Sequence, residues 1–175
     1  KEGVAIVSIS WVVISIFGAL PFYISGSIPS FVDCVFETVS GFTTTGATIL
    51  RDIESLENGI LLWRSFTHWF GGLGVLVFFL AVLPKSGATS LNIMNVESTG
   101  PTKDKMLPRT HQIAKTLYLL YSVLTLVLVV LLFAGGMPLF DAFIHAFGTV
   151  GTGGFSNRNI SVGYYDSAYI NLVLS

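Results

Sequence analysis

Three long apolar spans limit what this chain can fold into more than any other feature of its sequence. They cover residues 4–23, 60–83 and 113–134, and a fourth apolar run begins at Tyr169 and reaches Ser175. About 20 helical residues are needed to cross the ~30 Å hydrocarbon core of a bilayer. Each of the three spans meets that length. We therefore expect an all-α membrane protein.

The composition supports this class. The chain is 52% hydrophobic and 11% charged, with a mean hydropathy of +0.74, which leaves too little polar surface for a soluble globule. A signal peptide is the alternative interpretation of residues 4–23, but the run has spanning length and no basic cluster precedes it. The net charge of −1 gives no reason to expect a nucleic-acid partner. Because the last apolar run stops at Ser175, we expect a fragment of a longer protein.

An internal repeat gives the strongest functional signal. Residues 30–51 and 138–159 align without a gap, which places Asp33 over Asp141 and Gly46 over Gly154, 108 residues later. In each copy, a short apolar helical run leads into a loop rich in Gly and Thr. A helix of about a dozen residues cannot cross a bilayer. The repeat therefore predicts two re-entrant segments that dip into the membrane and return.

The helix start signals agree with this interpretation. Ser30 and Asp33 have nearly the spacing of a capping box, and Pro138 suits a first helical turn, with Asp141 three residues on. Both acids then lie at helix N-termini, where the macrodipole favours negative charge. The opposite ends of the helices, around Gly41 and Thr149, would direct partial negative charge at the two loops.

The loops have the composition of a cation pathway. Backbone carbonyls can replace the water that an ion sheds, and glycine lets them converge because it has no Cβ. Hydroxyls that bond back to helix carbonyls are the alternative for the threonines. A phosphate-binding loop is not expected at residues 151–154, since no Lys-Ser/Thr follows. The candidate ion-binding residues are Thr43, Thr44, Thr45, Gly46, Gly151, Thr152, Gly153 and Gly154.

The distribution of charge predicts the orientation. The linker at 84–112 is basic and should be cytoplasmic, because positive loops stay inside. Residues 51–58 are net acidic and should face outward. Each unit is then a helix, a re-entrant loop and a helix, and the two units have the same orientation. Acids in the outer segment, Asp52, Glu54 and Glu57, could concentrate cations or form an ordinary solvated loop.

Four groups of residues carry a family resemblance. They are the two loops, the Trp-Arg pair at 63–64 with the Trp-Phe-Gly-Gly-Leu-Gly stretch at 69–74, the Glu-Ser-Thr-Gly-Pro stretch at 97–101, and the Pro-Arg pair at 108–109. Together they resemble the Trk/Ktr/HKT superfamily of potassium transporters, and the linker and second loop resemble its bacterial TrkH type.

The resemblance implies an architecture and a function. Four such units would surround one potassium pore, and this chain would supply two, at 1–83 and 113–175, with the other two in the rest of the parent chain. It also implies a homodimer in the lipid of a bacterial inner membrane, a cytoplasmic nucleotide-binding regulatory subunit, and no cofactor. The ion-contacting carbonyls would be those of Thr44, Thr45, Gly46, Thr152, Gly153 and Gly154.

Ionisable residues within apolar helices are further candidates, since they are costly there and usually functional. Arg64 could snorkel to the interface or act at the pore side or in gating, and Glu37 must be paired or face water near the pore. His68 is expected to be a hydrogen-bonded packing residue. His145 occupies the repeat position of Glu37, and the two could form a buried contact between the units.

Two other function classes remain beside a channel-like potassium transporter. A cation-coupled secondary transporter also uses broken helices, although its repeats often have inverted topology. An intramembrane enzyme is not expected, because no G-x-S-x-G motif is present. The glycines at 71, 72 and 74 are expected to pack helices closely, since small residues permit such contact.

Overall fold

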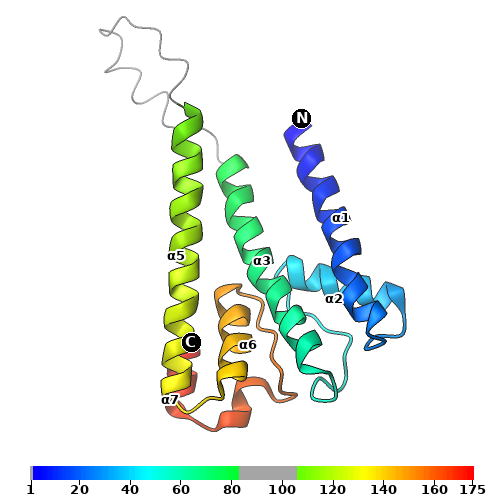
Figure 1. Ribbon diagram of the computed structural model, residues 1–175, viewed down its shortest axis with the longest axis vertical. Coiled ribbons are helices and arrows are strands. Elements are labelled where there is room, and N and C mark those ends of the chain that lie inside the picture. Colours follow the sequence, from blue (N-terminus) through cyan, green and yellow to red (C-terminus); the bar gives the residue numbers. More distant parts are fainter. Residues whose placement is uncertain (1, 83–105) are drawn as a thin grey trace, which may run out of the picture.

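The computed structural model describes residues 2–82 and 106–175, and these form helices joined by loops (Figure 1). Residues 83–105, which include most of the predicted cytoplasmic linker at 84–112, lie outside the described residues, and the last part of that linker, 106–112, belongs to α5. The helices are α1 (Glu2–Ile24), α2 (Phe31–Phe42), α3 (Asn58–Val82), α5 (Met106–Ala134), α6 (Leu139–Val150), the short 3-10 helix η1 (Ser161–Tyr165) and α7 (Ala168–Leu174).

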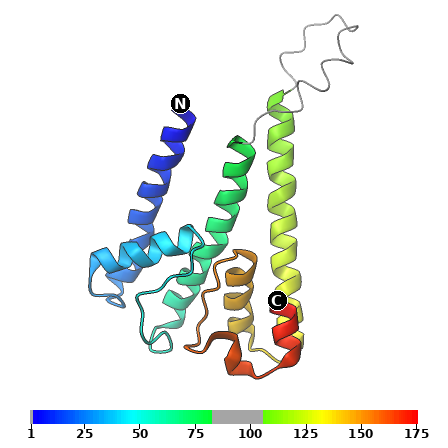
Figure 2. The same ribbon diagram turned by 180° about the vertical axis from the view of Figure 1, so that it is seen from behind.

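The long helices alternate in direction. Figures 1 and 2 show α1 and α5 running toward the end of the molecule that holds the loops, and α3 running away from it. The short helices α2 and α6 follow α1 and α5 at that end. Both units are thus built in the same orientation, as the sequence predicts.

The two short helices are equivalent in position and length. Helices α2 and α6 have 12 residues each, and their first residues, Phe31 and Leu139, are 108 positions apart. Twelve residues extend about 18 Å, which is too short to cross a membrane. Ser30 caps α2 by accepting the N–H of Asp33 at 3.4 Å. Pro138 is the N-cap residue of α6, one position before the helical turn predicted for it.

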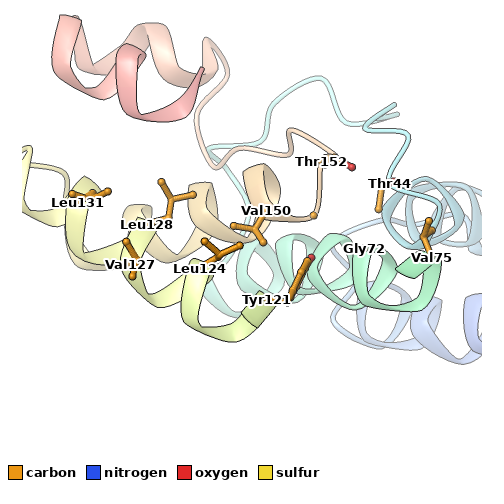
Figure 3. A pocket seen from close by; sticks show the side chains of 11 residues that line it. Thr44, Gly72, Val75, Tyr121, Leu124, Val127, Leu128, Leu131, Val150 and Thr152 are labelled. Atoms are coloured by element: carbon orange, nitrogen blue, oxygen red, sulfur yellow. The ribbon is translucent and has the colours of Figure 1, made fainter. Parts of the chain in front are cut away.

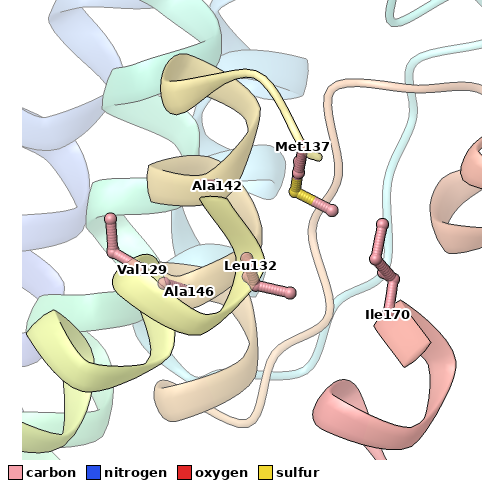
Figure 4. Packing of buried hydrophobic residues seen from close by; sticks show 6 residues of the cluster. All are labelled: Val129, Leu132, Met137, Ala142, Ala146 and Ile170. Atoms are coloured by element: carbon pink, nitrogen blue, oxygen red, sulfur yellow. The ribbon is translucent and has the colours of Figure 1, made fainter. Parts of the chain in front are cut away.

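Each unit buries its own apolar core, because its short helix packs against the long helix before it. The core of the first unit consists of Ala19, Phe22, Ile28, Cys34 and Ile60. The core of the second unit joins α5, α6 and α7, as Figure 4 shows, and consists of Val129, Leu132, Met137, Ala142, Ala146 and Ile170. Helix α3 contacts both α2 and α6, so it lies between the units.

The glycines of α3 let this helix approach both short helices. A Cβ at Gly71 would collide with the backbone of Phe42, the last residue of α2. A Cβ at Gly72 would lie 2.5 Å from the Tyr121 hydroxyl and 3.1 Å from Cα of Gly151. At Gly74 it would meet only the Trp11 ring, at an ordinary 3.4 Å. Close packing is therefore confirmed for Gly71 and Gly72, and it is much looser at Gly74.

The outer surface of the long helices is strongly apolar. Among the described residues, Ile113–Ala134 in α5 is long and apolar enough to cross a membrane, and Ser8–Ile24 in α1 is a shorter apolar helix. Large side chains on these two helices, such as Phe17, Leu119 and Val130, are about two-thirds exposed. Such a surface suits contact with lipid or with other apolar helices.

Candidate functional site

The two repeated loops have the same backbone conformation. Thr44 and Thr152 have φ values of 56° and 60°, and Gly46 and Gly154 have 75° and 76°. A positive φ is uncommon for threonine, so its occurrence at equivalent positions is informative. The hydrogen bonds also repeat. In each loop, the residue directly before this glycine donates its N–H to a carbonyl of the short helix. Thr45 bonds the Ser40 carbonyl at 3.0 Å, and Gly153 bonds the Gly148 carbonyl at 2.9 Å.

The loops lie against each other. A Cβ added to Gly46 would collide with the carbonyl oxygen of Gly153. Only a residue without a Cβ fits at Gly46, both for this contact and for its positive φ. The fold thus brings together the backbone of Gly46 and Gly153, which are 107 residues apart in the chain.

The predicted ion-binding residues differ in exposure. Thr43, Thr45, Thr152 and Gly154 are exposed, Gly151 is buried, and the others are half-buried. The Thr43 hydroxyl donates to the Val39 carbonyl at 2.7 Å and also lies 2.8 Å from the Thr45 hydroxyl. The alternative of hydroxyls bonding back to the helix therefore holds for Thr43.

Both short helices end at the loops. Thr43 and Gly151 are the C-cap residues of α2 and α6, so each helix directs its C-terminal carbonyls at the loop that follows. A helix C-terminus carries a partial negative charge of roughly half an elementary charge. Two such termini beside the touching loops make this region favourable for a cation.

Glu37 and Arg64 form a fully buried ion pair. The Nε of Arg64 donates to Oε1 of Glu37 at 2.5 Å, and the two residues are 1% and 0% exposed. Glu37 also accepts the Thr48 hydroxyl at 2.9 Å and the Ile49 N–H at 3.1 Å. Of the two predicted alternatives for Arg64, snorkelling is wrong, because its side chain is buried beside Glu37.

Arg64 also reaches the second loop. Its Nη1 donates to the Ser156 carbonyl at 3.0 Å, and its Cζ lies 3.5 Å from the centre of the Phe155 ring. His68 stacks on the same ring, with centroids 3.8 Å apart, and its Nδ1 accepts the Phe155 N–H at 3.4 Å. The His68 ring also fills the space where a Cβ of Gly153 would lie. The packing role predicted for His68 is confirmed.

Asp141 holds the segment after the second loop. Its carboxylate accepts Nδ2 of Asn157 at 2.6 Å, Nη2 of Arg158 at 3.1 Å and the Tyr165 hydroxyl at 2.6 Å. Burial raises the pKa of Tyr165, and the hydrogen bond to Asp141 raises this pKa further. The phenol therefore stays protonated at physiological pH and keeps donating to Asp141.

His145 and Glu37 have separate partners, although they occupy equivalent repeat positions. Nε2 of His145 lies 3.5 Å from the Ser156 hydroxyl, and its ring meets that of Tyr165 edge to face. Glu37 is instead satisfied by Arg64, Thr48 and Ile49, as described above. The predicted contact between Glu37 and His145 is therefore wrong, and Glu37 reaches the second unit through Arg64 instead.

The acidic outer segment is also tied to the second unit. The Asn159 amide donates to Asp52 at 2.9 Å, and its N–H donates to Glu54 at 3.1 Å. The Asn159 Oδ1 accepts the Ile53 N–H at 2.8 Å. Two of the three outer acids are therefore hydrogen-bonded to the second unit, while Asp52, Glu54 and Glu57 all remain exposed, as in a solvated loop.

A largely apolar pocket of about 600 Å³ lies beside the loops. Figure 3 shows residues of α5 at one end of this pocket and Thr44 with Val75 at the other. Among the described residues of its lining, side-chain oxygens come from Thr44, Tyr121 and Thr152, and the others are Gly72, Val75, Leu124, Val127, Leu128, Leu131, Val150 and Gly151. The apolar wall gives a cation no coordination, so the carbonyls of the loops are the better candidates.

Sequence reasoning missed two residues at this site, Phe155 and Asn159. Phe155 occupies the repeat position of Ala47, so it is a place where the two copies differ sharply in size. The replacement of a small residue by Phe was a usable signal that the second loop packs against large side chains, which are those of Arg64 and His68. Asn159 gave no such signal, because a single Asn in a polar loop is common.

The comparisons agree with this geometry. The family model described as "TrkH: Cation transport protein" matches residues 1–175. The Trk system potassium uptake protein TrkH of Salmonella typhimurium is 45% identical over the whole chain, and TrkG of Escherichia coli is 40% identical over 99% of it. The chain spans only 37% and 36% of these relatives, or about a third of their length.

A solved structure shows the same fold. The crystal structure of the potassium transporter TrkH from Vibrio parahaemolyticus matches with a TM-score of 0.82 and 38% identity. The match covers 99% of this chain and 34% of that one. With the family model matched along its entire length, the chain belongs to the TrkH family of cation transport proteins, which are all-helical membrane transporters.

Proposed function

We propose that this chain supplies two of the segments that form the selectivity filter of a potassium uptake pathway. The observation that carries the proposal is the pair of loops with identical φ pattern that touch at Gly46 and Gly153. Backbone carbonyls at such a point can replace the hydration shell of potassium. The relatives are named as potassium uptake proteins, which supports potassium as the transported ion.

The pathway needs more than this chain. Two loops surround only part of an ion, so we propose that two further units of the parent chain complete the ring. The share of the relatives that the chain covers leaves room for them. A homodimer and a cytoplasmic nucleotide-binding regulatory subunit, which controls a channel-like pore, belong to the same proposal and rest on the family resemblance.

The orientation can be tested by thiol labelling. We expect a cysteine at Ser55 to react with an impermeant thiol reagent added outside intact cells, and a cysteine at Thr102 to stay unlabelled until the membrane is opened. The reason is the acidic outer segment and the basic linker. Cys34 is replaced by Ala first, and this background variant is the unlabelled control. Labelling of Thr102 alone would reverse the proposed orientation.

Ion flux tests the function itself. Vesicles that contain the complete protein should take up rubidium or potassium in preference to sodium, while vesicles with the 175-residue chain alone should show no selective flux. Two loops leave about half of an ion's coordination shell unfilled. Varying the membrane potential separates passive flux from ion-coupled transport. Equal potassium and sodium uptake by the complete protein would contradict the proposal.

A further inference from the structure

We propose that Arg64 is a positioning residue that fixes the second loop relative to the first. It joins Glu37 of the first unit to the Ser156 carbonyl of the second. This inference rests on the proposed function, since it concerns the spacing of carbonyls that would bind the ion. It adds to that function a side-chain contact between the two units, through which the position of one loop depends on the other.

On the side of the first unit, Glu37 is fully engaged. Its carboxylate accepts hydrogen bonds from Arg64, from the Thr48 hydroxyl and from the Ile49 N–H. Thr48 and Ile49 directly follow the first loop, and Glu37 lies in the helix before it. The Glu37 carboxylate therefore joins the helix before the first loop to the backbone after it. Arg64 of α3 holds this carboxylate in place.

On the side of the second unit, Arg64 contacts the two residues that follow Gly154. Its Nη1 bonds the Ser156 carbonyl, and its guanidinium lies over the Phe155 ring. His68, one turn further along α3, covers this ring by stacking and accepts the Phe155 N–H. Phe155 is thus held between two side chains of the first unit's helix. Any shift of Arg64 would be passed to the backbone next to Gly154.

The chemistry of arginine suits this bridge. A guanidinium presents donors in a rigid planar fork and can bond two acceptors in different directions while it lies flat on an aromatic ring. Arg64 uses Nε for Glu37, Nη1 for Ser156 and its face for Phe155. A lysine has one compact ammonium group and cannot make all three contacts in this geometry.

In the described part of the second unit, the loop is held in a different way. There the segment after the loop is held by Asp141, through Asn157, Arg158 and Tyr165, all of which belong to the same unit. The repeat position of Glu37 is occupied by His145. Within the described residues, the second unit thus holds the segment after its own loop, while the first unit also contacts the loop of its neighbour through Arg64.

The test replaces Arg64 in the complete protein and measures the ratio of potassium to sodium uptake. Arg64→Lys keeps a positive charge for Glu37 but removes the simultaneous bond to Ser156, so we expect this ratio to fall about tenfold, as a modest change in relative ion binding produces. Arg51→Lys is the matched control, because Arg51 is exposed in the outer segment. We expect this control to keep the original ratio.

A ratio separates positioning from a purely structural role, because it does not depend on how much folded protein reaches the membrane. A lower expression level with an unchanged ratio for Arg64→Lys would show that the residue only stabilises the fold, and would overturn the inference. Glu37→Gln is the second variant, since the amide keeps the shape and one acceptor oxygen but loses the ion pair. An unchanged ratio in this variant would also overturn it.

The result can be distinguished from a failure of the proposed function. If Gly154→Ser lowers the ratio and Arg64→Lys does not, the loops form the filter and the Arg64 inference is wrong. If neither substitution changes the ratio, the proposed filter itself is wrong, and the inference falls with it. A fall in both, with Arg51→Lys unchanged, supports the inference.

Discussion

Gly46→Ser in the complete protein is expected to lower the preference for potassium over sodium at least tenfold, and by more than Gly154→Ser does. Both glycines have a positive φ near 75°, where another residue costs about 1–3 kcal/mol of strain. At Gly46 the new Cβ would also collide with the Gly153 carbonyl, whereas at Gly154 it meets nothing within 4 Å. A difference of ~1.4 kcal/mol in relative ion binding already changes selectivity tenfold.

Competition between rubidium and sodium uptake measures this effect at matched expression. Gly163→Ser is the control, because Gly163 lies in η1 with open space around it and without a positive φ. A larger effect at Gly154 than at Gly46 would contradict the steric argument. If both variants assemble and keep the original uptake ratio, the loops are not the selectivity filter.

The sequence predicted the elements that depend on local signals. Ser30 and Pro138 mark the starts of α2 and α6, and the glycine- and threonine-rich runs mark their ends, so both short helices could be placed to within a residue or two. The repeat also predicted that the two loops would be equivalent, because identical spacing of Gly46 and Gly154 implies identical backbone.

Contacts between the units could not be predicted in the same way. The register places His145 opposite Glu37 in the repeat, but the partner of Glu37 is Arg64, which no alignment of the two copies could reveal. Asp141 was expected only to favour its helix N-terminus, and it also binds three groups after the second loop. Such pairings depend on how α3 sits between the units, and that depends on the packing of the whole chain.

The small residues of α3 show how this packing positions the site. Gly71 touches the backbone at the end of α2, and Gly72 lies against Gly151 at the end of α6. Two consecutive residues of α3, which point to different sides of the helix, therefore determine how closely α2 and α6 approach it, and with them where the loops meet. Selectivity would depend on Gly46 and Gly154, while the existence of the folded site would depend on α3.

Gly71→Ala should accordingly reduce the stability of the folded protein. The added methyl group would collide with the Phe42 carbonyl, which is backbone and cannot rotate away, and overpacking of this kind costs about 1–3 kcal/mol. Thermal unfolding of the complete protein in detergent, followed by the loss of the monodisperse peak in size exclusion, measures the change.

Two controls in the same helix separate this collision from the general effect of removing a glycine. Gly59→Ala has open space around it and should be neutral or stabilising by up to ~1 kcal/mol, since glycine disfavours a helix. Gly74→Ala would place a methyl 3.4 Å from the Trp11 ring, an ordinary contact, and should change stability little. If Gly71→Ala is as stable as these two, then α3 does not rest on the end of α2, and another contact must set the depth of the first loop.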